Sequence, residues 1–258
     1  MQPPPFGRSS KNSDILSAFK SAQIANVLVA KTQPASIKDF QLGNEIFSYL
    51  TPSSTENSLS DRSSASGCYL VFEGQVRLLC QNLALQRPVS ADLLEAGAVF
   101  GADHLFCEQP LPYWVIATSS CRLVHIPYRQ LSVQLEQVPQ LQTYLSQGVQ
   151  QRERLIFFKR FTQQRSLPIH TLKHALLPEL VEQRVEAGAN LSQVLPNTGY
   201  FWLRAGQILN RSNPAPAPEV GDGWGYPDAI PEGWVAQTDL IIYTLPLGSW
   251  KTLNLLQR

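Results

Sequence analysis

The chain carries the same short pattern twice. Residues 67–76 read GCYLVFEGQV, and residues 199–208 read GYFWLRAGQI. Each segment begins with glycine, continues through a mostly apolar run, and ends in Gly-Gln followed by a β-branched residue. An apolar run that stops at glycine is typical of a strand followed by a tight turn. Because a repeat on this scale reflects a repeated structural unit, the sequence predicts two small β-rich modules rather than one large domain.

The landmarks around these two segments also recur in one order. Gly43 comes before the first segment and Gly188 before the second. The later pairs are GAVFG at 97–101 and GDGWG at 221–225, Trp114-Val115 and Trp234-Val235, and Ile126-Pro127 and Leu245-Pro246. Several landmarks in a shared order are unlikely to arise by chance, so they indicate a tandem duplication.

Charge and hydropathy exclude several classes of partner. The 258 residues are 43% hydrophobic, enough for sizeable cores, and carry a net charge of only +1. A near-neutral chain offers no basic surface for nucleic acid. No apolar run approaches the ~20 residues that span a bilayer, so we expect no direct membrane insertion. Residues 1–13 are polar and proline-rich without an apolar signal core, which predicts a disordered N-terminus and a cytoplasmic location.

Helical periodicity appears in two places. Residues 14–30 have a loose apolar stripe behind Ser13, a residue suited to capping a helix. Residues 141–164 repeat apolar positions at three- and four-residue steps. This longer helix has two alternative roles, and both stay open at this point. It could make contacts beyond its own module, by joining the two modules or by pairing two chains as a homodimer. It could instead pack only against its own module.

The module boundaries follow from these segments. The first module is assigned to residues 14–165 and the second to residues 166–258. The serine-rich stretch 52–66 has no counterpart in the second copy, so it predicts a disordered insertion. The four cysteines form no CxxC pair and are expected to be buried free thiols, while His170 and His174 are expected to be a surface pair without a third metal ligand.

The residues of the first module resemble a known family. The matching positions, spread over residues 40–145, are Gly43, Glu73, Gly74, Val76, Leu94, Gly97, Phe100, Gly101, Ala117, Cys121, Leu123, Ile126 and Pro127. They look like the cyclic-nucleotide-binding domain, the jelly-roll β-barrel of the cyclic AMP receptor protein and of kinase regulatory subunits. Residues 186–250 match more loosely. The resemblance implies a mainly β fold with flanking helices, built from two jelly-roll β-barrels in tandem.

The resemblance also implies where a ligand would bind. The candidate ligand-binding residues are Glu73, Gly74, Phe100, Gly101, Ala102, His104, Leu111 and Trp114. In the family, a glutamate after Phe-Gly takes the ribose hydroxyl, and an arginine about ten residues later neutralises the cyclic phosphate. Here Ala102 stands at the first place, and Leu111 or Pro112 at the second.

The charges near both cassettes oppose a cyclic phosphate. Neither 100–114 nor 221–234 contains Lys or Arg, and both contain carboxylates. Phosphate recognition relies on charge-assisted donors. The sequence therefore predicts degenerate cassettes and no cofactor. A cyclic-nucleotide sensor with an unorthodox cassette, with His104 as its cation, remains an alternative.

Catalysis has little support in the sequence. Gly-x-Ser-x-Gly, Walker and Gly-x-Gly-x-x-Gly motifs are missing. A cupin-like metal enzyme, the other alternative, would need more histidines in one barrel. We therefore expect a non-catalytic regulatory or scaffolding module that acts through protein contacts, with no metal and no nucleic-acid partner.

The partner is expected to be a protein. The resemblance extends to the N-terminal regions of bacterial peptide-exporting ABC transporters, where such barrels precede a peptidase and a membrane domain. It implies that the partner is a membrane transporter or a longer form of this same chain. The sequence ends at Arg258 without the helix that should close the second barrel, which fits an excised regulatory region or a separate subunit.

Overall fold

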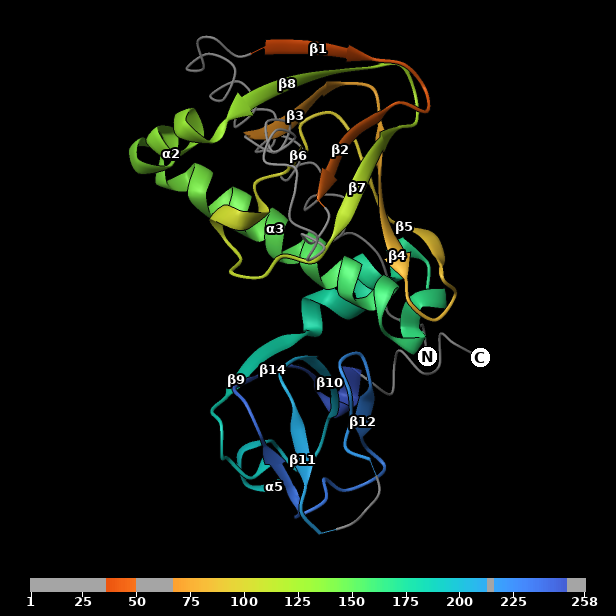
Figure 1. Ribbon diagram of the computed structural model, residues 1–258, viewed down its shortest axis with the longest axis vertical. Helices are drawn as coiled ribbons and strands as arrows, with labels where there is room; N and C mark the ends of the chain where they lie inside the picture. The colour runs from red at the N-terminus through yellow and green to blue at the C-terminus, as the bar shows by residue number, and fades with distance from the viewer. Residues whose placement is uncertain (1–35, 50–66, 213–215, 250–258) are drawn as a thin grey trace, which may run out of the picture. The chain divides into compact units, whose positions relative to one another are not determined.

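The computed structural model describes residues 36–49, 67–212 and 216–249 (Figure 1). The expected disordered N-terminus, the helix at 14–30 and the serine-rich insertion lie outside these residues. The chain forms two compact units: the first comprises residues 1–79 and 92–150, and the second comprises residues 80–91 and 151–258. The expected module boundary between residues 165 and 166 stays a prediction.

The first unit contains a four-stranded antiparallel sheet in the order β1-β8-β3-β6 (Figure 1). Its strands are β1 (Ser36–Phe40), β8 (Cys121–Pro127), β3 (Gly67–Glu73) and β6 (Val99–Phe100). The first five residues of β3 are all buried, as expected for an apolar strand covered on both faces. Cys68 and Leu70 form one core cluster with residues of α2 (Tyr128–Gln137) and α3 (Pro139–Arg160).

A second sheet has the order β2-β7-β4-β5. Its strands are β2 (Glu45–Tyr49), β7 (Tyr113–Ala117), β4 (Val76–Asn82) and β5 (Arg87–Leu94). Burial alternates along β4 and β7, so one face of this sheet supplies the core. A short 3₁₀ helix, η2 (Asp103–Leu105), lies between β6 and β7.

The second unit contains a four-stranded sheet and a two-stranded one. One sheet has the order β12-β10-β14-β9 and the other pairs β11 with β13. The strands are β9 (Val181–Val185), β10 (Tyr200–Ala205), β11 (Ile208–Asn210), β12 (Gly223–Gly225), β13 (Trp234–Ala236) and β14 (Leu240–Leu245). The short helical segments are η3 (Gln163–Ser166), α4 (Ile169–Thr171), η4 (Leu172–Leu176), η5 (Leu177–Glu179) and α5 (Leu191–Val194).

The architecture is thus mainly β with flanking helices, as the sequence predicts. The expected closed barrels are not found: within the described ranges, every sheet is open, with an edge strand at each end. The physical reason is strand length. Strands as short as β6, β11 and β12, of two or three residues, form too few hydrogen bonds to join one sheet continuously to the next.

The predicted long helix exists as α3 and is followed by η3. Leu141 and Leu145 are buried in the core of the first unit. In the second unit, Phe158 packs edge-on against Trp202 with ring centroids 5.1 Å apart, and Phe157 against Tyr243 at 5.2 Å. The apolar positions of α3 are therefore covered within the chain, and pairing of two chains through 141–164 stays a prediction.

The strand registers of the two units agree residue by residue. In the first unit Tyr69 lies opposite Phe100; in the second, Phe201 lies opposite Trp224. Both long strands are also irregular at the same place. The register of β3 against β8 shifts between Val71 and Glu73, and that of β10 against β14 shifts between Leu203 and Ala205. These positions correspond in the two repeated sequence segments.

The tight turns that follow β3 and β10 also agree between the two units. Gly74 and Gly206 have φ values of +84° and +96°, which only glycine adopts at low cost. A Cβ at Gly74 would lie 2.5 Å from the Ser120 carbonyl oxygen, and one at Gly206 would lie 2.4 Å from that of Asp239. Corresponding backbone bonds recur as well: Gly97 donates to Val71 over 2.8 Å, and Gly221 donates to Leu203 over 2.9 Å.

One pair of landmarks was aligned wrongly by sequence. Ala117 lies opposite Val76 in the first unit, and Ala236 lies opposite Ile208 in the second. This register places Trp234 at the position of Val115, one residue away from Trp114. Because side chains alternate across a strand, the shift turns the Trp234 ring toward the core of its unit, where it packs against Trp224.

We expect alanine at either turn glycine to destabilise its own unit. Gly74→Ala and Gly206→Ala should each cost at least about 2 kcal/mol, since the new Cβ meets a backbone oxygen at a positive φ. Hydrogen exchange measured separately over residues 67–127 and 181–245 should locate each loss. Gly148→Ala, at a helical glycine with open space around it, is the control. Equal protection in all three variants would contradict the assigned turn geometry.

Candidate functional site

The predicted cassette begins where β6 ends. Phe100 is fully buried and stacks on Tyr69 with ring centroids 5.4 Å apart. Ala102 is only 1% exposed. It belongs to the core cluster that contains Leu131 and Leu141 of the helices α2 and α3. The side chain at the position of the family's glutamate is therefore directed into the packed interior.

A hydrogen-bond network ties the cassette backbone to nearby tyrosines. The Gly101 N–H donates to the Tyr113 hydroxyl oxygen over 3.0 Å, and the Tyr113 hydroxyl donates to the buried carboxylate of Asp103. The Tyr128 hydroxyl donates to the Gly101 carbonyl. Burial, assisted by the nearby Cys68 and Asp103, raises the pKa of Tyr128, so this hydroxyl keeps its proton. The chain itself satisfies polar groups that a ligand would otherwise contact.

The sequence did not reveal this network. Asp103 is one of the carboxylates that were expected to oppose a phosphate, and no sequence motif singles out Tyr113 or Tyr128. One signal was present: Tyr113 stands next to the predicted Trp114 in a strand, so the two side chains must face opposite sides. Tyr113 is fully buried, whereas Trp114 is partly exposed.

The two remaining candidates of the cassette, Leu111 and His104, differ in burial. Leu111, at one of the two expected arginine positions, is 7% exposed and part of the core, and Pro112, at the other, is partly buried. His104 is exposed, and its ring lies 5.0 Å from that of Tyr49 and 5.3 Å from that of Tyr128 between centroids. Of the side chains expected to face a cyclic nucleotide, Ala102 and Leu111 are thus aliphatic groups in the interior, whereas His104 is exposed.

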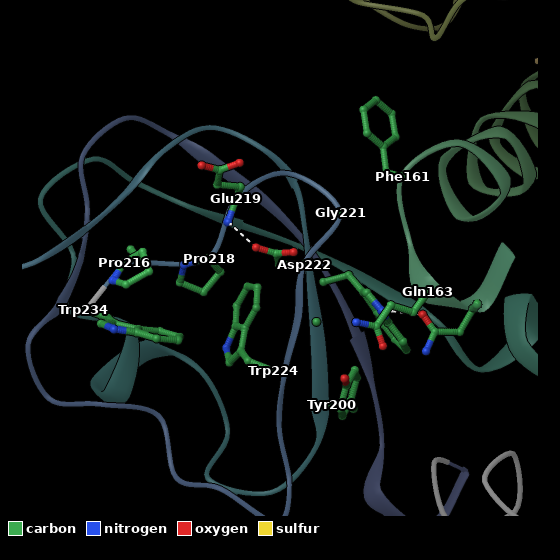
Figure 2. Close-up of a pocket in the computed structure, with 14 residues that line it drawn as sticks. Phe161, Gln163, Tyr200, Pro216, Pro218, Glu219, Gly221, Asp222, Trp224 and Trp234 are labelled. Carbon is green, nitrogen blue, oxygen red and sulfur yellow. Dashed lines mark hydrogen bonds between the residues drawn. The ribbon is translucent and has the colours of Figure 1, made fainter. Parts of the chain in front are cut away.

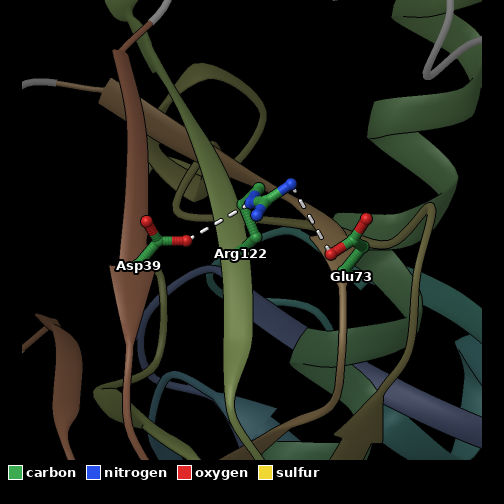
Figure 3. Close-up of polar contacts among 3 residues, drawn as sticks. All are labelled: Asp39, Glu73 and Arg122. Atoms are coloured by element: carbon green, nitrogen blue, oxygen red, sulfur yellow. Dashed lines mark hydrogen bonds and ion pairs between the residues drawn. The ribbon is translucent and has the colours of Figure 1, made fainter.

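Glu73 and Gly74 lie at the far end of β3. Phe100 pairs with Tyr69, and Glu73 follows four residues later, about 13 Å along an extended strand. Arg122 of β8 contacts the Glu73 carboxylate at 3.7 Å and that of Asp39 of β1 at 3.3 Å (Figure 3). The structure therefore does not bring Glu73 together with Phe100, Gly101, Ala102 and His104, and its carboxylate is engaged by an arginine.

A pocket of about 420 Å³ lies in the second unit (Figure 2). Its lining residues are Phe161, Gln163, Gln164, Tyr200, Trp202, Pro216, Ala217, Pro218, Glu219, Gly221, Asp222, Gly223, Trp224 and Trp234. The sequence places several aromatic residues in this part of the chain, and such crowding is by itself typical of a core. Phe201 and Trp202 are buried as a core would require, but the pocket itself depends on how distant segments meet.

Hydrogen bonds hold two walls of this pocket in place. The Trp202 indole N–H donates to Gln164 Oε1 over 3.1 Å. The Glu219 backbone N–H donates to the Asp222 carboxylate over 2.9 Å (Figure 2). Burial, and then the negative charge of Asp222, raise the pKa of the Tyr200 hydroxyl. The pocket therefore combines aromatic walls with negative charge.

Other candidate chemistry is limited. In the described part of the chain, no three His, Cys, Asp or Glu residues are grouped as a metal would require. His170 and His174 are both exposed, with ring centroids 4.4 Å apart. None of the four cysteines, all of which the structure describes, forms a disulfide; Cys68, Cys80 and Cys121 are buried as expected, whereas Cys107 is partly exposed. Among the helices that the structure describes, none has the length and apolarity to span a membrane.

Residues 59–137 match the family described as the cyclic nucleotide-binding domain. The match supports one such domain, with the jelly-roll type of fold, and most of the matched residues belong to the first unit. The match includes β3 to β8 and α2, and with them the cassette. A search of curated proteins finds no match.

Several solved structures resemble the chain at low identity. The catabolite activator protein of Thermus thermophilus is 18% identical over 50% of this chain and 54% of its own, with a TM-score of 0.37. The CLP regulator of Xanthomonas campestris, described as responsive to c-di-GMP, is 18% identical over 72% and 80%, at 0.41. The regulatory domain of Toxoplasma gondii PKA, crystallised with cAMP, is 14% identical over 90% and 84%, at 0.33.

Proposed function

We propose that this chain is a non-catalytic regulatory or scaffolding module that acts through protein contacts and does not bind a cyclic nucleotide through its cassette. The observation that carries the proposal is the burial of Ala102. The side chain at the position of the family's ribose-binding glutamate is 1% exposed and packs into the core. A cassette whose key position is part of the interior contributes to stability instead of presenting a group to a ligand.

The electrostatics of the cassette support the same proposal. Residues 100–114 supply no lysine or arginine, and Asp103 adds a buried carboxylate. A cyclic phosphate entering here would lose its hydration without gaining the charge-assisted hydrogen bonds that offset such a loss. Arg122 lies on β8, the strand next to β3, and already forms ion pairs with Glu73 and Asp39.

The proposal includes a second copy of the same fold. The matching registers, the matching irregularities in β3 and β10, and the matching turns at Gly74 and Gly206 support a tandem arrangement. The cassette of the second copy would then be residues 225–234. It lacks lysine and arginine and is shorter than its counterpart, because Trp234 corresponds to Val115.

We propose that the chain is located in the cytoplasm and that its partner is a protein. The resemblance of the sequence to the N-terminal regions of peptide-exporting ABC transporters supports a transporter, or a longer form of this chain, as that partner. The open reading frames on either side of the coding sequence test the idea. The expected result is a peptidase or membrane domain in frame with the coding sequence, or a transporter gene next to it. The idea would be contradicted if every genome that carries the chain lacked both.

Titration with cyclic nucleotides tests the proposal on the first unit. Calorimetry with cyclic AMP, cyclic GMP and cyclic di-GMP should show no saturable heat, which corresponds to a Kd of about 1 mM or weaker and at most about 4 kcal/mol of binding free energy. A cyclic AMP-binding regulatory domain in the same buffer is the positive control. A micromolar Kd for this chain would overturn the proposal and establish an unorthodox cyclic-nucleotide sensor instead.

A further inference from the structure

The pocket of the second unit has walls of a consistent chemistry. Its aromatic lining residues are Phe161, Tyr200, Trp202, Trp224 and Trp234. A short loop adds Pro216, Ala217 and Pro218 to the lining. Among the described residues of its lining, the charged ones are Glu219 and Asp222, both negative. Both are exposed on the loop that leads into β12, so their charge acts at the mouth of the pocket.

Gly223 explains why aromatic rings line this pocket. A Cβ there would lie 2.7 Å from Tyr200 Cε1 and 3.0 Å from Trp202 Nε1. The glycine therefore lets both rings approach the backbone of β12. At the matching strand position of the first unit, Val99 places a side chain against the core cluster of that unit. The second unit thus has aromatic faces where the first has aliphatic packing.

Two hydrogen-bond donors in the lining of the pocket lack an acceptor among the residues that the structure describes. The Nε1 atoms of Trp224 and Trp234 are both buried in this state, and Trp224 is only 9% exposed. In Figure 2 the indole nitrogen of Trp224 is on the side of the pocket where Pro218 and Trp234 lie. Buried N–H groups are normally paired. A small shift of these rings would let an uncharged acceptor on an occupant take one of these bonds.

We propose that this pocket binds an organic cation: an ammonium or guanidinium group on an apolar body that also carries an uncharged acceptor such as a carbonyl. The faces of tryptophan and tyrosine rings attract cations, and the carboxylates of Glu219 and Asp222 add to that attraction. The same two carboxylates would repel an anion. The volume of about 420 Å³ lies in the range of small-molecule sites. The cation could belong to a free small molecule or to an arginine side chain of a peptide.

Titration by tryptophan fluorescence tests this site. Benzoylcholine joins a quaternary ammonium, an ester carbonyl and a phenyl ring, and it should bind saturably. Benzenesulfonate, of opposite charge, should not. In a second arm, acetylarginine amide should bind better than acetylcitrulline amide, which has the same shape without the charge. Tighter binding of benzoylcholine would indicate a free small molecule as the source, and tighter binding of acetylarginine amide would indicate a peptide side chain.

A matched pair of variants separates the pocket from general surface charge. Glu219→Gln with Asp222→Asn removes both carboxylates, and the new amide oxygen at position 222 can still accept from the Glu219 backbone N–H. This variant should bind benzoylcholine about fivefold more weakly. Glu186→Gln with Asp228→Asn removes the same charge from exposed positions outside the lining and should change the affinity by less than about 1.5-fold.

Three results would overturn the proposal: no saturable fluorescence change with either cation, equal binding of benzenesulfonate, or unchanged cation affinity in the Glu219 and Asp222 variant. The thermal unfolding midpoint of each variant, measured alongside, verifies that the exposed substitutions leave the fold intact. The site belongs to the second unit and shares no residue with the cassette of the first. Its outcome is therefore independent of the cyclic-nucleotide titration.

Discussion

Ala102→Glu should unfold the first unit instead of restoring cyclic-nucleotide binding. The substitution supplies the carboxylate that the family's cassette uses, but here the side chain points into the core cluster with Leu131 and Leu141. An unpaired buried carboxylate is costly, and we expect a loss of about 3–5 kcal/mol. Thermal unfolding and hydrogen exchange over residues 67–127 measure that loss.

The pH dependence identifies the cause of this loss. Burial raises the pKa of an introduced carboxyl in the folded state above its unfolded value of about 4.3. The penalty should therefore grow as the pH rises through that value and shrink below it. Ala102→Gln, which cannot ionise, should show no such change relative to the natural chain.

A matched control keeps the charge and changes only the burial. Gln109→Glu introduces the same carboxylate at an exposed position of the same loop and should alter stability by less than about 0.5 kcal/mol. The assigned packing would be refuted by an Ala102→Glu variant that melts like the natural chain. Measurable cyclic AMP binding by that variant would show instead that the cassette lacks only its glutamate.

Glu153→Ala should destabilise the second unit by about 3–5 kcal/mol. Glu153 of α3 and Arg204 of β10 form an ion pair at 2.9 Å, with side chains only 6% and 14% exposed. Removing the carboxylate leaves the guanidinium buried and unpaired, beside the ring of Phe157. Denaturant unfolding monitored by tryptophan fluorescence suits this measurement, because Trp202, Trp224 and Trp234 lie in the same unit.

The double variant distinguishes pairing from simple loss of packing. Glu153→Met with Arg204→Met removes both charges and keeps most of the volume, so it should cost less than Glu153→Ala alone. The exposed pair of Asp39 and Arg122, whose side chains are 73% and 45% exposed, is the control. Asp39→Asn there should cost less than about 1 kcal/mol. Equal losses at the two pairs would contradict the role assigned to burial.

Local rules predicted much of this fold. Alternating and continuous apolar runs predicted the strands, because burial of one or both faces of a strand leaves a period that the sequence displays. Glycines before and after those runs predicted the turns, and Gly74 and Gly206 do have positive φ. The similarity of the two sequence segments was visible for the same reason, since a turn at positive φ favours glycine wherever it occurs.

The candidate site was less predictable. The lack of lysine and arginine near the cassette is a property of composition and could be read directly. The burial of Ala102 could not, because it depends on α2 and α3, whose residues lie some thirty to forty positions further along the chain. The position of Trp234 was misjudged by one residue, since sequence similarity favours matching tryptophans whereas backbone hydrogen bonds match Ala236 with Ala117.

The sequence by itself determined where strands and turns form, which segments repeat, and which charges are missing from both cassettes. Each of these depends on a few neighbouring residues and on the side-chain period of a strand. Only the tertiary structure decided that Ala102 is part of the core, that Glu73 is engaged by Arg122, and that the rings of Tyr200, Trp202, Trp224 and Trp234 surround a pocket with a negative mouth. These features depend on contacts between segments that are far apart in the chain. Strand register and side-chain packing determine those contacts, and no local sequence pattern predicts them.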